Sequence, residues 1–469
     1  MRFTSAALPA LLLSLSSAAT AFTPPAAFKN VNLVHVVSAE KNYVKETINV
    51  LVENIADAPQ NEYYLAIPSD KLAHVGGVEV KDRKDAAAGP FTAEAVDDEY
   101  LRITLPTPLA AGAQQTLGIT YYVLSAYRPL PALIAQDDKQ YLVYDFSAYV
   151  PSAYETAKQK TEIKFANSDV PEYTKFEGKD KDLVQKQGAK LTYGPFEAQP
   201  AGALRPVSVR FEFTKPVSHV QRLERDIEVS HWGGNVAFEE RYHLVNHGAN
   251  LSSLFNRVKW AQSAYYNPQT FALKELRFPL RPGSADAYYT DVIGNVSTSR
   301  FRSGKREALL EIKPRYPVFG GWTFPFTIGW NADAATFLRR LSGGSYVLNV
   351  PFLEGPKQQE GVEYETVRLR IILPEGAENV KYSANIPASS IAASTVTVHK
   401  TFLDTKGRTT VVIDARNLVD EFRDREVLVT YDYSLLASLR KPIVVFGSVM
   451  SLFVAAYVIG SVDLKFSKK

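Results

Sequence analysis

The sequence predicts an all-β protein made of two tandem antiparallel β-sandwich domains and one C-terminal transmembrane helix. Several runs alternate apolar and polar residues with a two-residue period, the signature of half-buried strands. The 25 Tyr, 25 Phe and frequent Pro and Gly between these runs suit antiparallel sheets with one solvated face. Near the C-terminus, Ile443 to Val462 is a stretch of twenty residues without a charge. This length of uncharged, mostly apolar sequence is typical of a membrane span.

Residues 1–21 have the pattern of a signal peptide. Arg2 is followed by no charge until Lys29, and the apolar run from Leu8 to Ala19 is too short to span a bilayer comfortably. The run ends on small residues, which predicts cleavage before Phe22. An apolar helix of the folded domain is the alternative, but two prolines follow directly at positions 24 and 25 and would break it. We therefore expect the body of the chain in the lumen of the endoplasmic reticulum.

Four runs in the body show the two-residue alternation most clearly. They are Lys45–Val52, Leu101–Leu105, Val207–Phe213 and Val367–Leu373. Helical periodicity is scarce, and Asp333 to Leu341 is the one short candidate. The body is therefore predicted to consist almost entirely of strands.

The length of the body predicts two domains, 22–215 and 216–438. Lys215-Pro216 interrupts the strand pattern, and the segment that follows it resembles the segment at the beginning of the body. Alternating residues of the two segments align at an offset of 194 residues. The aligned pairs are Val44 with Phe238, Glu46 with Glu240, Ile48 with Tyr242 and Val50 with Leu244. Related domains or two unrelated first strands would both give this match.

Residues 439–462 are predicted to form the transmembrane helix with its juxtamembrane residues, and 463–469 a cytosolic tail. The flanking Lys and Arg residues do not decide the orientation, but the signal peptide predicts a type I topology. Charges on both sides of the helix exclude a glycosylphosphatidylinositol anchor. Gly447, Ser451 and Ala455 recur at i, i+4 and i+8, which predicts a face for close packing against another helix. Small residues also occur by accident on lipid-facing anchors.

The composition and the residue spacing argue against several classes of active site and ligand. The chain has no Cys, which excludes thiol nucleophiles and thiolate metal sites, and its formal net charge of +3 gives no support to nucleic-acid binding. His243 and His247 are four residues apart, but the context is a strand end rather than a zinc-binding helix. Asp97-Asp98-Glu99 and Glu239-Glu240 are interpreted as acids on solvated faces and turns. Neither suits a glycosidase pair, because adjacent strand residues point to opposite faces. No catalytic, cofactor-binding or metal-binding residue is predicted.

Two other features invite a functional interpretation. Asn250-Leu251-Ser252 and Asn295-Val296-Ser297 are sequons in loop-like surroundings, which predicts N-glycans on Asn250 and Asn295. The aromatic stretch from Tyr316 to Phe326, followed by Trp330, is dense. Buried strand and turn is its first interpretation, and a partner or membrane-interface surface is the second.

Several longer motifs resemble the ribophorin I family, the large lumenal subunits of the oligosaccharyltransferase complex. The resemblance is sharpest between residues 216 and 331. The motifs are Trp232–Glu240, Tyr242–Asn246, Phe278–Arg281, Tyr288–Asp291 and Arg315–Trp322. The very short tail is similar to fungal members of the family and lacks lysines placed as a dilysine retrieval signal. Retention in the endoplasmic reticulum would then depend on membership of a complex.

The resemblance implies a non-catalytic subunit of the enzyme that transfers a dolichol-linked oligosaccharide to Asn of N-x-S/T in nascent proteins. Its implied role is scaffolding and substrate presentation, without a cofactor. The implied partners are the other subunits, including the catalytic polytopic one, with nascent polypeptides, the translocon and the lipid bilayer. Two alternatives from other classes stay open: a membrane-anchored lumenal glycoside hydrolase and a two-domain adhesion-type receptor.

Overall fold

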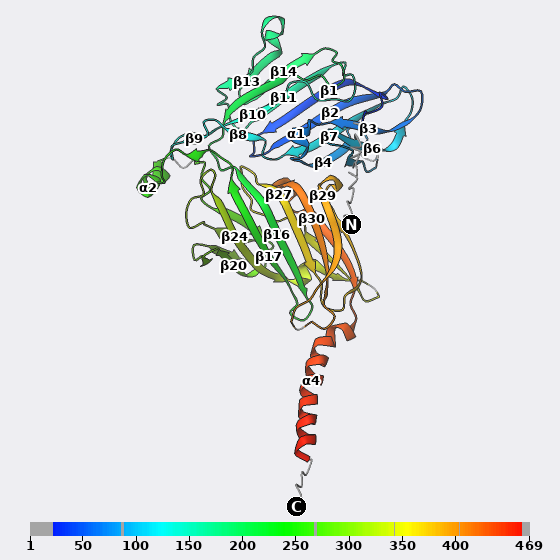
Figure 1. The fold of residues 1–469 in the computed structure, drawn as a ribbon, viewed down its shortest axis with the longest axis vertical. Helices are drawn as coiled ribbons and strands as arrows, with labels where there is room; N and C mark the ends of the chain where they lie inside the picture. Colours follow the sequence, from blue (N-terminus) through cyan, green and yellow to red (C-terminus); the bar gives the residue numbers. More distant parts are fainter. Residues whose placement is uncertain (1–21, 86–88, 267–269, 342, 403, 462–469) are drawn as a thin grey trace, which may run out of the picture.

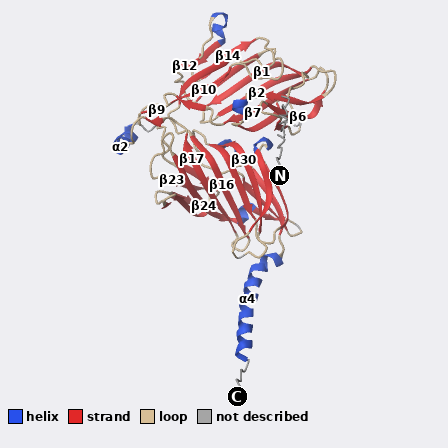
Figure 2. Cartoon of the chain, in the orientation of Figure 1, coloured by secondary structure: helices blue, strands red, loops and turns tan. Residues whose placement is uncertain are grey.

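The computed structural model describes residues 22–85, 89–266, 270–341, 343–402 and 404–461. The predicted signal peptide, 1–21, and tail, 463–469, lie outside the described residues. Figure 1 shows three regions along the long axis: an N-terminal part (22–215), a C-terminal part (216–434) and a protruding C-terminal helix. Strands dominate both parts, as Figure 2 shows by colour, so the predicted all-β class with one C-terminal transmembrane helix is confirmed.

The N-terminal part contains a seven-stranded sheet in the order β13-β14-β11-β1-β2-β7-β4. Its strands are β1 (Phe28–Ala39), β2 (Val44–Asn54), β4 (Val75–Asp82), β7 (Gln114–Val123), β11 (Gln159–Phe165), β13 (Val184–Gln187) and β14 (Lys190–Phe196). Two smaller sheets, β12-β15-β10-β8 and β3-β6-β5, complete this part. Their strands are β3 (Gln60–Ala66), β5 (Thr92–Ala95), β6 (Tyr100–Leu109), β8 (Tyr127–Pro129), β10 (Tyr141–Ser147), β12 (Glu172–Tyr173) and β15 (Pro206–Glu212), with the short helices α1 (Ser69–Leu72) and η1 (Gly178–Leu183) between strands.

The C-terminal part is built on an eight-stranded sheet in the order β21-β20-β24-β17-β16-β27-β30-β29. Its strands are β16 (Ser218–Ser230), β17 (Asn235–Asn246), β20 (Ala285–Asp291), β21 (Gly294–Asn295), β24 (Thr323–Asp333), β27 (Glu363–Ile372), β29 (Ile391–His399) and β30 (Arg408–Val419). Sheets β25-β26-β31-β28 and β19-β23-β22 pack into the same core. Their strands are β19 (Leu276–Leu280), β22 (Arg300–Ser303), β23 (Ala308–Ile312), β25 (Leu338–Arg340), β26 (Ser345–Pro351), β28 (Glu378–Ala384) and β31 (Glu426–Asp432).

All four predicted strand runs are confirmed, in β2, β6, β15 and β27, except that Phe213 and Leu373 lie one residue beyond their strands. The predicted helix from Asp333 to Leu341 is mostly wrong. Only α3 (Ala334–Phe337) is helical, with the Asp333 side chain accepting from the backbone N–H of Ala335. The chain then turns into β25, where Leu338 to Arg340 pair with β26, so the ladder overrides the local helical preference. The remaining short helices are α2 (Arg257–Tyr266), which was not predicted, η2 (Ala388–Ser390) and η3 (Asp420–Phe422).

The two parts repeat one arrangement of strands. In the first, β1 pairs antiparallel with β2 and parallel with β11. In the second, β16 pairs antiparallel with β17 and parallel with β27. The offset of 194 residues thus aligns β2 with β17, which hold equivalent places in their sheets, and all eight aligned residues are buried. The parallel pairings depart from a purely antiparallel sandwich, and the hydrophobic pattern of a single strand carries no signal for them.

Helix α4 (Leu435–Ser461) extends away from the body, and none of its residues is buried. Its mean hydropathy of 2.3 over an 18-residue window suits a membrane span. Pro442 lies inside the helix, just before the uncharged stretch begins. A side chain surface this apolar, uncovered by the rest of the chain, requires lipid or other helices around it.

Candidate functional sites

The connection between the two parts is a mostly buried segment held by hydrogen bonds from two buried side chains. The Gln140 amide group donates to the carbonyl oxygens of Phe213 (2.8 Å) and Lys215 (3.1 Å) and accepts from Ala249 N–H (2.8 Å). The Asn246 amide oxygen accepts from Val217 N–H at 3.1 Å. Both Gln140 and Asn246 are fully buried. Such bonds favour one conformation of the connecting backbone, since losing the bond to Ala249 or Val217 would leave a buried N–H group unpaired.

Asn246 also fixes the segments behind the connection. Its amide nitrogen donates to the carbonyl oxygens of Phe271 (2.7 Å) and Val318 (3.0 Å), and its oxygen accepts from Gly248 N–H at 3.0 Å. With the bond from Val217, the side chain makes four hydrogen bonds, which is the amide group's usual capacity. Asn246 therefore ties four separate backbone segments together.

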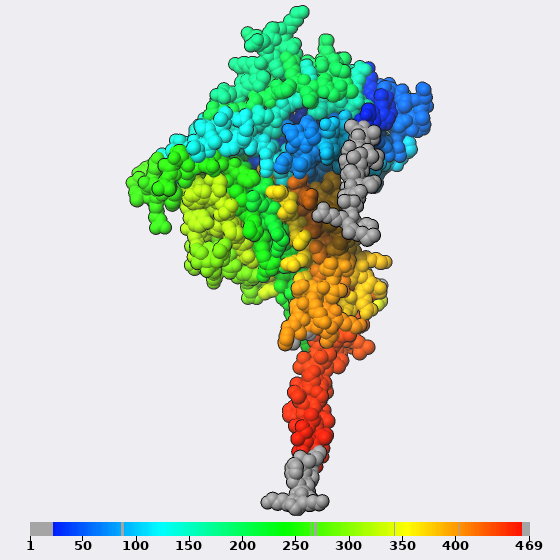
Figure 3. All heavy atoms as spheres, viewed as in Figure 1, coloured from blue at the N-terminus to red at the C-terminus, as the bar shows by residue number. Residues whose placement is uncertain are grey.

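A second set of contacts locks the broad boundary between the parts, which is visible in Figure 3. Glu421 of the C-terminal part accepts from Lys45 (2.6 Å) and from the Tyr122 hydroxyl (2.8 Å). Gly76 approaches so closely that an added Cβ would lie 1.9 Å from the carbonyl oxygen of Asn417. The strands β9 (Leu133–Ile134) and β18 (Asn250–Leu251) also pair across the boundary. The two parts are therefore packed closely against each other along this boundary.

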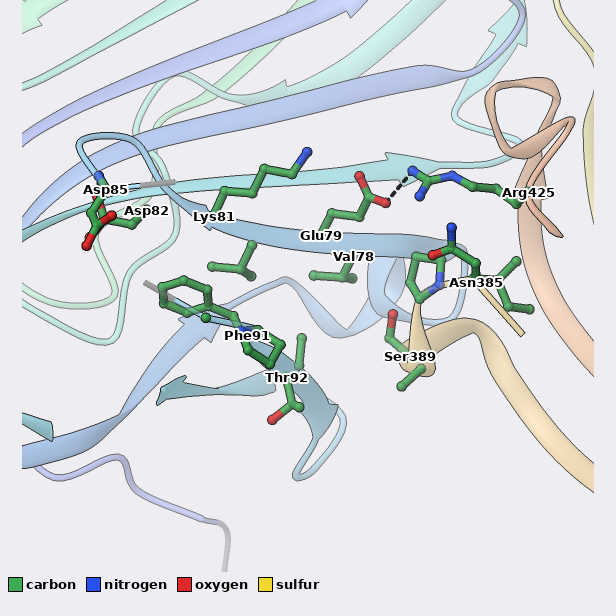
Figure 4. Close-up of a pocket in the computed structure, with 17 residues that line it drawn as sticks. Val78, Glu79, Lys81, Asp82, Asp85, Phe91, Thr92, Asn385, Ser389 and Arg425 are labelled. Atoms are coloured by element: carbon green, nitrogen blue, oxygen red, sulfur yellow. Dashed lines mark hydrogen bonds and ion pairs between the residues drawn. The ribbon is translucent and has the colours of Figure 1, made fainter. Parts of the chain in front are cut away.

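A cavity of about 370 Å³ lies at this boundary, between β4, β5 and η2. Figure 4 shows Val78, Phe91 and Thr92 around it, with the salt bridge from Arg425 to Glu79 (2.6 Å) at one end. The carboxylate of Asp82 at the rim accepts from Gln115 and two backbone N–H groups; although burial acts in the other direction, these bonds lower its pKa. A glycosidase acid needs a raised pKa. Nothing in this geometry gives Asp82 or Glu79 that role.

Each part buries one glutamate at the positions that the repeat aligns. In the N-terminal part, Glu46 accepts from the hydroxyls of Tyr121 (2.6 Å) and Tyr144 (2.7 Å) and pairs with His35 (2.8 Å). Although burial opposes it, the His35 contact holds the pKa of Glu46 far below its usual range. This cluster is closed within the core, so its evident role is to specify packing.

In the C-terminal part, Glu240 shares the buried Arg225 with Glu354. The guanidinium donates to Glu240 and, at 2.6 Å, to Glu354, and Arg225 and Glu240 have no exposed surface. The Tyr242 hydroxyl donates to the second oxygen of Glu240 at 2.6 Å. Burial raises the pKa of Glu240, with Arg225 acting against the shift. Adjacent Glu239 is on the other face, where Tyr288 donates to it at 2.6 Å. The two neighbouring glutamates therefore lie on opposite faces of β17, each with its own partners.

The two histidines four residues apart are not brought together. His243 is exposed, whereas the ring of His247 stacks on His219 with centroids 4.3 Å apart. Burial, with nearby His219, lowers the pKa of His247 to about 4. Among the described residues, no group of three or more His, Asp or Glu is placed to hold a metal ion.

Close backbone packing and a positive φ explain the two glycines of the Arg315–Trp322 motif. An added Cβ on Gly320 would lie 2.0 Å from the carbonyl oxygen of Ala249, and Gly321, at φ +75°, donates to the carbonyl oxygen of Asn246. The dense aromatic stretch around them is mainly core: Phe319, Phe324 and Trp330 are buried. The buried interpretation of this stretch is therefore the right one, and it is not a partner surface as a whole.

The structure places the candidate modification and packing residues as follows. Asn250 and Asn295 are exposed, in β18 and β21. Gly447, Ser451 and Ala455 lie on α4, exposed along its length. The Ser451 hydroxyl donates within the helix to the carbonyl oxygen of Ser448 at 2.7 Å, so this face presents close approach rather than free hydroxyl donors.

One surface was missed in the sequence. Helix α2 projects from the boundary between the parts, at the left of Figure 1. Tyr265 and Tyr266 on it are each 84% exposed, and Leu254 before it is 94% exposed. Its apolar residues lack the 3.6-residue period of a core-facing helix, so the pattern gave no reason to expect it.

Comparison with known proteins covers almost the whole chain. The family model described as Ribophorin I matches residues 28–460. "Dolichyl-diphosphooligosaccharide--protein glycosyltransferase subunit 1" of Schizosaccharomyces pombe is 29% identical over 92% of this chain and 95% of its own length. Subunit 1B of Arabidopsis thaliana is 30% identical over 98% and 97%, and subunit 1B of Oryza sativa 31% over 93% of each. The solved structure of native yeast LTA4 hydrolase aligns with a TM-score of only 0.26 at 10% identity, over 40% of this chain and 30% of that one. The chain belongs to the ribophorin I family.

Proposed function

We propose that this chain is a non-catalytic subunit of the oligosaccharyltransferase complex in the endoplasmic-reticulum membrane. Membership of the family over nearly the full length carries the proposal, since the curated relatives are named as subunit 1 of that enzyme. The chain would scaffold the catalytic polytopic subunit and present nascent polypeptides arriving from the translocon. The body would be lumenal and α4 would cross the bilayer once.

The hydrogen-bonded and closely packed connection between the two parts supports a scaffolding role. We propose that residues 22–215 and 216–438 are two domains joined at Lys215-Pro216. Two large hydrophobic clusters support this division, although Tyr43, Tyr122 and Leu124 of the first part join the second cluster. Domains held by buried hydrogen bonds keep attached subunits at a fixed distance, which hinged domains would not.

The alternative functions find less support. A glycoside hydrolase needs two carboxyl groups across a sugar-binding cleft, and the buried Glu46 and Glu240 are enclosed by their own partners. An adhesion-type receptor would be found in the plasma membrane. Affinity purification of the tagged chain followed by mass spectrometry tests all three proposals. We expect the catalytic subunit among the partners, and recovery without any oligosaccharyltransferase subunit would contradict the proposal.

We predict that Asn250, Asn295 or both carry an N-glycan in the native host. Both side chains are exposed, and so are Ser252 and Ser297, the hydroxyl residues of the two sequons. Endoglycosidase treatment should therefore increase the electrophoretic mobility of the wild-type chain. Changing both Asn residues to Gln should abolish the difference, and each single change assigns its site. A wild-type chain whose mobility does not change would contradict the prediction.

We predict that replacing Gly447, Ser451 and Ala455 together with Leu lowers recovery of the catalytic subunit while membrane insertion is retained. The change raises hydrophobicity, but it pushes away any helix that packs on the small face. Helix contacts of this kind are worth about 0.6 to 2 kcal/mol each, so partial loss is expected. The measurement is co-purification in mild detergent, normalised to the amount of bait.

The matched control changes three residues on the opposite side of the same helix. At 100° per residue, Val449, Ala456 and Gly460 lie about 140 to 180° from Ser451, and their replacement with Leu should change recovery little. Equal recovery of both variants and the wild type would show that the small face does not contact another subunit.

A further inference from the structure

A second cavity, of about 450 Å³, lies where the C-terminal part meets the membrane helix. Its walls come from the end of β16 and the turn after it, from the loop at Pro374 and Glu375, and from the first turns of α4. On the helix side it reaches Pro442 and Val445. Because the uncharged stretch begins at Ile443, this end of the cavity lies at the edge of the hydrocarbon layer.

Aromatic rings line the body side of this cavity. They belong to His231, Trp232 and Tyr433, and the rings of His231 and Tyr433 are 4.6 Å apart. Trp232 is 67% exposed, yet its indole nitrogen donates to the carbonyl oxygen of Ser438 at 2.7 Å, which fixes it beside α4. Burial lowers the pKa of His231, so its ring is neutral at pH 7. Neutral aromatic faces of this kind attract methylated ammonium groups.

Among the described residues, one carboxylate in the lining of this cavity has an oxygen without a hydrogen-bond partner. Glu375 is only 6% exposed, and its Oε1 accepts from the hydroxyl and N–H of Thr405 and from the N–H of Lys406, at 2.7 to 2.8 Å. Although burial acts in the opposite direction, these bonds lower the pKa of Glu375, so the group is ionised at neutral pH. Its Oε2 has no hydrogen-bond partner within the part of the chain that the structure describes. A buried, ionised and unpaired oxygen is costly, and a cationic ligand would remove that cost.

Three acids and two bases lie around the cavity. Glu228, Glu375, Arg408 and Lys441 line it, and Asp404 behind them forms a salt bridge with Lys441 at 2.6 Å. This excess of negative charge favours a cation and gives no net attraction for a purely anionic group. The Lys441 side chain is 41% exposed and is available to a second partner such as a phosphate. A ligand that carries both a cation and an anion matches this arrangement.

We propose that this cavity binds the phosphocholine headgroup of a membrane lipid. The trimethylammonium group lies on the rings of His231, Trp232 and Tyr433 against Glu375, and the phosphate faces Lys441. The acyl chains follow α4 from Pro442 and Val445 into the bilayer. The site goes beyond the proposed subunit function, because it concerns lipid chosen by headgroup rather than a protein partner.

The test uses the full-length chain purified in detergent, incubated with equimolar phosphatidylcholine and phosphatidylglycerol of identical acyl chains. Native mass spectrometry counts the lipids that stay bound. We expect roughly three- to tenfold enrichment of phosphatidylcholine over phosphatidylglycerol. Glu375→Gln, which keeps one accepting oxygen but removes the charge, should abolish the enrichment. Glu378→Gln, at an exposed position of β28, is the matched control and should leave it unchanged.

A second pair of variants does not depend on the core. Val445→Trp fills the membrane end of the cavity from an exposed helix position, and Val449→Trp adds the same ring one turn further along. Only the first should reduce bound phosphatidylcholine. Wild-type binding without headgroup preference, preference for phosphatidylglycerol, or equal binding by Glu375→Gln and Val445→Trp would each overturn the proposal. If Val445→Trp instead lowers recovery of the catalytic subunit with lipid binding unchanged, a protein occupies the cavity and the lipid proposal is wrong.

Discussion

Replacing Arg225 with Met is expected to destabilise the C-terminal part by about 3 to 5 kcal/mol. The guanidinium lies in the core between Glu240 and Glu354. Its central carbon is 5.2 Å from the ring centroid of Phe238 and 5.8 Å from that of Trp330. Met fills a similar volume, so lost packing is small. The cost comes from two carboxylates that remain buried without their shared cation. Hydrogen exchange of the full-length chain should show lost protection in β16 and β17, with β1 and β2 less affected.

Two further variants separate buried charge from loss of packing. Arg241→Met removes an arginine whose side chain is 40% exposed on the same hairpin, and it should cost less than about 1 kcal/mol. Replacing the whole network with apolar residues, as Arg225→Met, Glu240→Leu, Tyr242→Phe and Glu354→Leu together, should recover most of the stability. This account would be contradicted if the single Arg225→Met variant were as stable as the wild type. It would also be contradicted if the quadruple variant were less stable than the single variant.

The strands and the membrane helix could be predicted from the sequence because their signals are local. A two-residue alternation such as Val367 to Leu373 fixes which side chains are buried, and a twenty-residue uncharged stretch has few outcomes besides a membrane span. The 194-residue offset also aligned Glu46 with Glu240, but nothing local showed that both are buried. Their partners, Tyr144 and Glu354, are 98 and 114 residues away along the chain. The predicted solvated position of Glu240 is therefore wrong, because its side chain has no exposed surface.

Long-range partnerships limited the prediction of sites in the same way. Asn246 belongs to one of the motifs that indicated the family, yet its four bonds reach segments from Val217 to Val318. The lipid-facing cavity likewise combines Trp232, Glu375 and Lys441, which no spacing rule connects. In α2 the difficulty was different, since an exposed helix without a buried stripe has no hydrophobic period to detect.

Changing Asn246 to Asp is expected to cost about 2 to 4 kcal/mol and to loosen the connection between the two parts. The amide nitrogen donates to the carbonyl oxygens of Phe271 and Val318, and a carboxylate has no donor to offer them. The Phe271 carbonyl oxygen would then lose this donor at a cost of roughly 1 to 3 kcal/mol, whereas the Val318 carbonyl oxygen would keep its bond from the Leu273 N–H and lose about 0.5 to 1.5 kcal/mol. Because the site is fully buried, water cannot replace the lost donors without opening the structure.

The location of the loosening distinguishes this prediction from general destabilisation. Hydrogen exchange should rise at Val217, Gly248 and Gly321, whose N–H groups bond to the Asn246 side chain or carbonyl. Asn235→Asp, at the other end of the same strand, is the matched control. Asn235 is partly exposed and its amide donates one side-chain bond, to Asn331 at 3.0 Å, so the cost should stay below about 1 kcal/mol. If the Asn246→Asp variant has the same unfolding midpoint as the Asn235→Asp control, and if hydrogen exchange at these three sites is unchanged, Asn246 does not hold the connection. In the Asn246→Asp variant both parts should stay folded, but co-purification should recover less of the complex. Subunits bound to the two parts would no longer be held at one distance.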